Sequence, residues 1–186
     1  TRKIVNNESS EIIRMFNSEF VGVAGNDLDF YPTEHRAEID RLNDKIYHNI
    51  NNGAYRCGFA QSQQAYEDAY DGLFATLDEL DERLATRRFL CGSQPSEADW
   101  RLLPTMVRFD VAYFSLFKCN KKRIQDYPNL WPYVCDLVAW PGVARTVHPR
   151  QYIANYYSIE RLNPPGIIPK GCPVDFTTPH NRASMR

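Results

Sequence analysis

Apolar side chains recur three or four residues apart through most of the chain, which is the period of helices with one buried face. The longest stripe follows Ser62, the expected N-cap, and lies opposite a face rich in Asp and Glu. Its members are Tyr66, Ala69, Tyr70, Leu73, Phe74, Leu77, Leu80 and Leu84. A second helix is predicted after Pro32, with Gly53 as its stop signal. Its apolar positions are Ile39, Leu42, Ile46, Tyr47 and Ile50.

A third long helix is predicted to begin at Ser96. The Ser96 hydroxyl can accept a hydrogen bond from the amide three residues later, and Asp99 can bond back to the Ser96 amide, a capping box in which Asp replaces the usual Glu or Gln. Apolar residues then cover much of the helix circumference, which is typical of the central helix of a bundle. They are Leu102, Leu103, Met106, Val107, Phe109, Val111, Phe114 and Leu116. Pro104 is expected to bend an early turn.

The two ends of the chain differ from this pattern. Residues 3–5 are a short apolar run that predicts the end of a strand leading into a helix, and no partner strand follows. That helix carries Ile12, Ile13, Phe16 and Phe20. A strand end without a partner leads us to expect that the chain is part of a larger protein and that the first half of that protein is missing from it.

Three short helical segments are predicted at 127–140, 142–147 and 149–157. From residue 163 onward, five prolines predict an extended tail that cannot hold a helix. The sequence therefore predicts an all-α bundle with an extended Pro-rich C-terminal tail.

Composition narrows the classes of function. The 22 basic and 23 acidic residues give a net charge of −1, which argues against a nucleic-acid partner bound through a basic field. No apolar run approaches the ~18 residues that span a bilayer, and the first residues lack the apolar region of a signal peptide. We therefore expect no membrane partner and a cytoplasmic location.

Cysteine and histidine offer little chemistry by spacing alone. The five cysteines are Cys57, Cys91, Cys119, Cys135 and Cys172, and no two form a C-x-x-C pair, so reduced thiols are expected. Cys57 is expected in a loop between two helices and is the nucleophile candidate by position, but no His lies near it, which favours a structural role. The four histidines are far apart, so no metal site is expected.

Two further groups of side chains leave alternatives open. Lys118, Lys121, Lys122 and Arg123 form a basic cluster beyond the central helix, which could attract an anion, although cations that complement a helix C-terminus are the stronger interpretation. Among the 11 tyrosines, several lie near expected helix ends. Phenols that converge on one cleft could donate to a thiolate or a quinoid oxygen, whereas spacing alone favours core roles.

Eight segments of the chain carry a further signal, at residues 7–12, 51–60, 97–102, 108–110, 117–120, 127–131, 156–157 and 163–167. Together they resemble the C-terminal domain of the glutathione transferase superfamily. The Asn-Asn-Gly sequence within 51–60 and the Phe-Lys-Cys-Asn sequence at 117–120 resemble specifically the glutathionyl-hydroquinone reductases, or xi class. The resemblance covers nearly the whole chain.

This resemblance implies a glutathione transferase C-terminal-type bundle over 21–162, preceded at 1–20 by the end of a thioredoxin-like domain and followed by a tail at 163–186. It implies an enzyme that reduces glutathionyl-hydroquinones with a second glutathione, releasing hydroquinone and glutathione disulfide. The nucleophilic cysteine of such enzymes belongs to the thioredoxin-like domain, so the 186-residue chain alone is expected to be inactive. A homodimer formed through the helical domain is also implied.

The resemblance assigns glutathione binding to Glu8 and Ser9. A helix N-terminus offers amides and a favourable dipole to the γ-glutamyl carboxylate, and the Glu8 carboxylate can pair with the amino group. The alternative for both residues is first-turn capping.

The resemblance also implies catalytic roles for three tyrosines. Tyr55 matches the group that exchanges a proton with the quinol oxygen, and Tyr113 and Tyr156 match donors that lower the pKa of the nucleophilic cysteine. Tyr157 is the neighbour most easily confused with Tyr156. The alternatives are an omega-like thioltransferase or dehydroascorbate reductase, and a non-catalytic glutathione transferase-like dimerisation or binding module.

Overall fold

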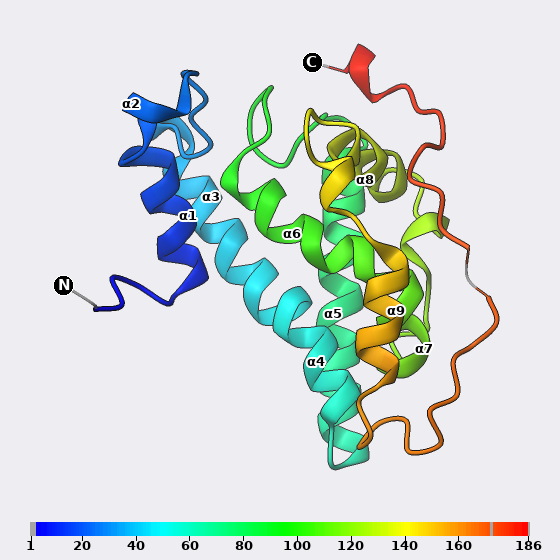
Figure 1. Ribbon diagram of the computed structural model, residues 1–186. Coiled ribbons are helices and arrows are strands. Elements are labelled where there is room, and N and C mark those ends of the chain that lie inside the picture. The colour runs from blue at the N-terminus through cyan, green and yellow to red at the C-terminus, as the bar shows by residue number, and fades with distance from the viewer. Residues whose placement is uncertain (1–2, 172, 186) are drawn as a thin grey trace.

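The computed structural model describes residues 3–171 and 173–185, and every regular element in this part of the chain is helical (Figure 1). The α-helices are α1 (Ser9–Ser18), α2 (Val21–Ala24), α3 (Arg36–Lys45), α4 (Asn52–Phe59), α5 (Gln63–Leu84), α6 (Glu97–Arg108), α7 (Phe114–Leu116), α8 (Leu130–Val138) and α9 (Pro149–Tyr157). Segments η2 (Ile46–Asn51) and η3 (Phe109–Tyr113) are π-helical. Short 3-10 turns are η1 (Thr33–His35), η4 (Ile124–Asp126), η5 (Ala144–Thr146) and η6 (Arg182–Ser184). The all-α prediction is confirmed.

The strand end predicted at residues 3–5 is wrong, because these residues form no regular element. An extended segment needs a partner strand for its backbone hydrogen bonds, and the described part of the chain contains none. The helix predicted after it is present as α1, yet none of its residues is buried.

Segments α3, η2 and α4 form one long helical run, visible as the inclined helix in Figure 1. The stop signal predicted at Gly53 is therefore wrong. Gly53 is buried inside α4, and a Cβ there would lie 3.7 Å from the Cβ of Leu73 in α5. The helix therefore continues through this glycine, because the contact between α4 and α5 holds it in a helical conformation that local sequence does not reveal. For the same reason Cys57 lies in helix α4 and not in the loop that we expected.

Helix α6 begins as predicted. The Ser96 amide donates to Asp99 Oδ2 over 2.7 Å, completing the capping box, and Asp99 Oδ1 accepts from the Leu90 amide and the Tyr133 hydroxyl. Burial raises the pKa of Asp99, against the effect of these hydrogen bonds. The helix continues past Pro104 and packs against α3, η2, α8 and α9, as a central helix should.

The core lies between α5, α6 and the long run from α3 to α4. The α5 stripe supplies its apolar side chains as predicted, except that Tyr66 and Tyr70 lie at the half-buried rim. The fully buried members of the stripe are Leu73, Phe74, Leu77, Leu80 and Leu84. Burial of this face supplies the main driving force for the bundle.

The described part of the C-terminal tail, residues 163–171 and 173–185, runs along one side of the bundle without regular structure apart from η6 (Figure 1). The expectation that it holds no helix fails at this single turn. There Arg182 is only 2% exposed and donates to the carbonyl oxygens of Leu84, the last residue of α5, and of Arg87 and Arg88 just beyond it. A guanidinium satisfies several helix-end carbonyls at once, which anchors the tail to the bundle.

Candidate functional site

Three tyrosine hydroxyls meet at one end of the bundle. The Tyr156 hydroxyl of α9 lies 2.7 Å from the hydroxyl of Tyr55 in α4 and 2.7 Å from that of Tyr113 at the end of η3. Either oxygen can be the donor in each pair. The structure thus brings together the three tyrosines that the resemblance singled out, and we call them the tyrosine cluster.

Phe117 forms the apolar wall behind the tyrosine cluster. Its ring stacks on Tyr113 with centroids 5.0 Å apart and meets Tyr55 edge-on at 5.2 Å. This packing depends on Gly58, since a Cβ at that position would lie 2.5 Å from the Phe117 ring. A glycine in α4 therefore sets how closely the helix approaches the wall.

The three phenols differ in exposure and in acidity. Tyr55 is 41% exposed, whereas Tyr113 is 3% exposed, so the cluster leads from the surface into the core. Burial, and then the contact with Tyr156, raises the pKa of Tyr113 far above its usual value of 10. Burial also raises the pKa of Tyr156 to about 12. Both inner phenols are therefore protonated near neutral pH and can donate hydrogen bonds to an anion.

Tyr156, rather than its neighbour Tyr157, supplies the hydroxyl of the cluster. Tyr157 is buried, and its carbonyl oxygen accepts a hydrogen bond from Asn163 Nδ2. Consecutive helical residues point about 100° apart, so only one of the pair can face Tyr113.

Glu8 and Ser9 lie at the start of α1, whereas the tyrosine cluster is formed by residues of α4, η3 and α9. Glu8 occupies the N-cap position, its carbonyl oxygen accepts from the Ile12 amide, and its side chain makes no capping hydrogen bond. Both residues are exposed. The two predicted groups of residues therefore belong to different elements of the chain.

An apolar groove of about 640 Å³, absent from our sequence predictions, lies beside α1. Its lining includes Ile13, Phe16, Val21, Leu28, Tyr47 and Trp100, with Ser9 among the lining residues. Asn51 Oδ1 and Trp100 Nε1, both buried without a hydrogen-bond partner among the described residues, belong to lining residues too. The sequence signal for this groove was the apolar stripe of α1, which includes Ile13 and Phe16. In the structure these side chains remain partly exposed.

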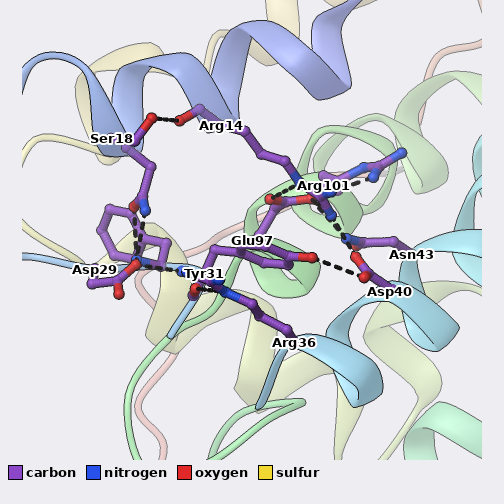
Figure 2. Close-up of polar contacts among 11 residues, drawn as sticks. Arg14, Ser18, Asp29, Tyr31, Arg36, Asp40, Asn43, Glu97 and Arg101 are labelled. Carbon is purple, nitrogen blue, oxygen red and sulfur yellow. Dashed lines mark hydrogen bonds and ion pairs between the residues drawn. The ribbon is translucent and has the colours of Figure 1, made fainter. Parts of the chain in front are cut away.

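A charged cluster fastens α1 to α3 and α6 (Figure 2). Arg14 donates to the buried carboxylate of Glu97 over 2.9 Å and to Asp40, and its guanidinium lies 4.0 Å from the centre of the Tyr31 ring. Glu97 also accepts from Asn43 over 2.8 Å. The hydrogen bond with Glu97 is the main cause of a raised pKa for Arg14. These contacts hold α1 against the bundle while its apolar face remains uncovered.

Comparisons with known proteins agree with this architecture. Residues 63–134 match the family described as the glutathione S-transferase C-terminal domain. The chain is 52% identical to glutathionyl-hydroquinone reductase PcpF of Sphingobium chlorophenolicum over 171 aligned residues. This alignment covers 91% of the chain and 55% of the relative. The glutathione-bound structure of YqjG, a glutathione transferase homolog from Escherichia coli K-12, superposes with a TM-score of 0.94 at 44% identity, covering 97% of this chain and 59% of that one.

A xi-class glutathione transferase from Natrialba magadii superposes with a TM-score of 0.95 at 42% identity, covering 98% of this chain and 56% of that chain. The helical bundle is a glutathione transferase C-terminal domain of the xi class. The chain spans a little over half the length of the curated relatives it matches.

The cysteines of this xi-class domain are buried wherever the structure describes them. Burial raises the pKa of Cys91 to about 11 and that of Cys135 to about 12, which keeps both thiols protonated near neutral pH. Cys172 lies outside the described residues. The Cys119 thiol lies 3.8 Å from the carbonyl oxygen of Phe117.

The basic cluster of the domain finds partners within the chain. Lys121 donates to Asp78 over 3.0 Å, Arg123 pairs with Asp126, and the Lys122 ammonium lies 3.9 Å from the centre of the Tyr127 ring. These contacts favour the structural interpretation over anion binding. In the described residues, no group of three or more potential metal-ligating side chains is found, and no helix is long and apolar enough to cross a membrane.

Proposed function

We propose that this domain is the helical, substrate-binding part of a glutathione-dependent reductase that converts glutathionyl-hydroquinones to hydroquinones and releases glutathione disulfide. The observation that carries the proposal is the chain of three phenols, of which the outermost is exposed and the inner two remain protonated. The likeness to a protein named glutathionyl-hydroquinone reductase supports it.

The proposed reaction proceeds in two steps. A cysteine thiolate of the enzyme attacks the glutathionyl sulfur, the carbon–sulfur bond breaks with its electron pair going to the ring, and the ring carbon takes up a proton. A second glutathione thiolate then attacks the mixed disulfide, releasing glutathione disulfide and restoring the cysteine thiolate. Overall one carbon–sulfur bond is reduced and two glutathionyl sulfurs are joined.

The tyrosines have distinct roles in this proposal. Tyr55, being exposed, exchanges a proton with the quinol oxygen as the ring changes its electronic state. Tyr113 and Tyr156 donate hydrogen bonds that stabilise the thiolate and lower the pKa of the nucleophilic cysteine. Glu8 and Ser9 hold the γ-glutamyl end of glutathione at the N-terminus of α1.

The nucleophile, in this proposal, belongs to a thioredoxin-like domain whose last part is residues 1–20. The uncovered face of α1 supports this organisation, because Ile13 is 37% and Phe16 59% exposed, and both residues line the apolar groove. Apolar patches of this kind mark surfaces that another structural unit covers. A homodimer formed through the helical domain, and the 186-residue chain being inactive alone, complete the proposal.

The test uses Tyr55→Phe in a full-length protein that includes the thioredoxin-like domain. We expect kcat with a glutathionyl-hydroquinone to fall about 100-fold, since a positioned acid or base contributes at least that much, while the melting temperature is unchanged. Tyr70→Phe is the matched control, because Tyr70 is half-buried outside the tyrosine cluster. Turnover by Tyr55→Phe equal to that of the control would contradict the proton-transfer role.

The same full-length protein separates the alternatives. Rates with a glutathionyl-hydroquinone and with dehydroascorbate are measured side by side, and we expect the former to be the better substrate. A preference for dehydroascorbate would favour an omega-like thioltransferase. Absence of turnover with either substrate would favour a non-catalytic binding or dimerisation module.

A further inference from the structure

The buried ring of Phe117 touches all three phenols of the tyrosine cluster. Its centroid lies 5.0 Å from that of Tyr113, and the two rings stack with 18° between their planes. The ring meets Tyr55 and Tyr156 edge-on, with centroids 5.2 Å and 5.7 Å away. Phe117 itself is fully buried. One side chain is therefore a packing partner shared by the phenols of α4, η3 and α9.

The backbone that carries Phe117 is fixed to the backbone of Tyr113. The amides of Phe117 and Cys119 both donate to the Tyr113 carbonyl oxygen, over 3.2 Å and 3.1 Å. Between them, Lys118 adopts a left-handed conformation with φ 60°, and its carbonyl oxygen accepts from the Tyr66 hydroxyl over 2.7 Å. A non-glycine residue in this region costs energy, so the surrounding contacts hold the turn in this form.

The contact with α4 is equally close on the other side of the ring. A Cβ at Gly58 would lie 2.5 Å from the Phe117 ring, so no space separates the ring from the helix backbone. Phe59 meets the ring of Phe117 edge-on at 5.6 Å and lies nearly parallel to Tyr55, with 9° between the two planes. Because the ring is packed on both sides, it cannot tilt without moving a phenol of the tyrosine cluster.

The hydrogen bonds of the tyrosine cluster depend on how the phenol rings are inclined. The Tyr156 hydroxyl lies 2.7 Å from the hydroxyls of both Tyr55 and Tyr113. Each hydroxyl is at the end of its ring that is farthest from the backbone, so a tilt of the ring displaces the oxygen most. Hydrogen bonds weaken steeply as their angle departs from the preferred range. A fixed support for all three rings therefore preserves both contacts at once.

We propose that Phe117 is a positioning residue for the reaction, whose ring holds the three phenols of the tyrosine cluster in one hydrogen-bonded alignment. The inference rests on the proposed function, and Phe117 acts in it only through the phenols. A displacement of about 1 Å at a reacting group can lower turnover about 100-fold. Loss of the support should therefore reduce kcat, whereas KM should change little because the phenols act on groups formed during the reaction.

The experiment compares Phe117→Leu with Phe74→Leu. Phe74 is a 1% exposed core residue of α5 whose ring contacts Tyr70 and Phe109, so the two substitutions remove the same atoms from equally buried sites. In the full-length protein with its thioredoxin-like domain, Phe117→Leu should lower kcat with a glutathionyl-hydroquinone about 10-fold or more, with KM changed less than about 2-fold. Phe74→Leu should leave kcat within about 2-fold of wild type.

A second measurement needs no substrate. The 186-residue chain is isotope-labelled at the tyrosine Cζ atoms, whose NMR signals respond to hydrogen bonding of the hydroxyl. The three signals of the tyrosine cluster are assigned by replacing each of its tyrosines with Phe. Phe117→Leu should shift them toward the signal of a solvated tyrosine, and Phe74→Leu should leave the signals of Tyr55 and Tyr156 in place. Far-UV circular dichroism checks the fold, and Phe117→Met, which keeps a similar volume without a planar ring, replaces Phe117→Leu if that variant does not fold.

The two measurements separate failure of this inference from failure of the proposed function. Unshifted signals in Phe117→Leu, or a kcat equal to that of Phe74→Leu, would overturn the positioning role while leaving the reductase activity intact. Shifted signals in a protein whose wild type turns over no glutathionyl-hydroquinone would overturn the proposed function and, with it, the catalytic part of the inference.

Discussion

The tyrosine cluster and the charged cluster around Glu97 each join three helical elements, but they do so with different chemistry. In the tyrosine cluster neutral hydroxyls lie 2.7 Å apart, and either oxygen of each pair can donate. In the charged cluster Arg14 and Glu97 have fixed donor and acceptor roles. A chain of reversible donors can pass or share a proton, whereas a fixed ion pair can only hold its elements together. Their contributions to stability should differ accordingly.

The largest effect is expected from Glu97→Ala. Glu97 is 4% exposed and accepts from Arg14, Asn43 and Arg101, so its removal leaves buried polar groups unpaired. We expect a loss of about 3 kcal/mol in the free energy of unfolding, measured by urea denaturation. Glu79→Ala, which removes a half-exposed partner of Lys45, is the control and should cost less than about 1 kcal/mol. Equal losses of stability in the two variants would show that the charged cluster contributes no more than an exposed ion pair.

A smaller loss is expected from Gly58→Ala. The new methyl group would lie 2.5 Å from Phe117, which must move against the tyrosine cluster, at a cost of about 1–3 kcal/mol. Gly53→Ala in the same helix is the control: its Cβ would meet its nearest atom at 3.7 Å, so the gain in helix propensity should stabilise the chain by about 0.5–1 kcal/mol. Urea unfolding and near-ultraviolet circular dichroism of the tyrosines provide the measurement. Opposite signs are expected, and destabilisation of both variants alike would contradict this account.

Tyr156→Phe should cost about 1 kcal/mol near neutral pH, because the buried Tyr113 hydroxyl loses its partner. The folded-state pKa of Tyr156, about 12, lies above its usual value of 10, so folding favours the protonated phenol. The contribution of this pKa difference to the free energy of unfolding is present below pH 10 and is lost as the pH rises through 12. The difference between the wild-type chain and Tyr156→Phe should therefore shrink over this range. Tyr152→Phe, on the same helix, serves as the control.

The smallest effect is expected from Asp40→Asn. The Asp40 side chain is 50% exposed, so its ion pair with Arg14 is well solvated and should contribute less than about 1 kcal/mol. Hydrogen bonds from Tyr31 and Arg14 lower the pKa of Asp40 against the opposing effect of partial burial. Its contribution should therefore be present above pH 4 and disappear as the pH falls below the usual pKa of 3.8, or as salt is added. A cost unaffected by acid or salt would point to lost packing instead.

Local sequence predicted the elements whose causes are local. The capping box of Ser96 and Asp99 and the apolar stripe of α5 lie where periodicity and capping chemistry placed them. The errors share one origin. Gly53, expected as a stop, lies buried inside a helix that packs against α5, and Arg182, in a segment expected to be an irregular tail, donates to carbonyl oxygens about a hundred residues earlier in the chain.

In the candidate site, too, local sequence and contacts between distant segments determined different features. The resemblance identified Tyr55, Tyr113 and Tyr156, but spacing alone favoured core roles for each of them. Their convergence and the groove beside α1 both depend on which helices meet.

The sequence by itself determined that this protein is helical, where its main helices begin, and which faces they bury, because hydrogen bonds and apolar periodicity act over a few residues. Only the tertiary structure decided which phenol faces which, how close α4 lies to Phe117, and what remains uncovered on α1. Those properties arise from packing between segments distant in sequence, and close packing selects one arrangement from many that share the same local pattern.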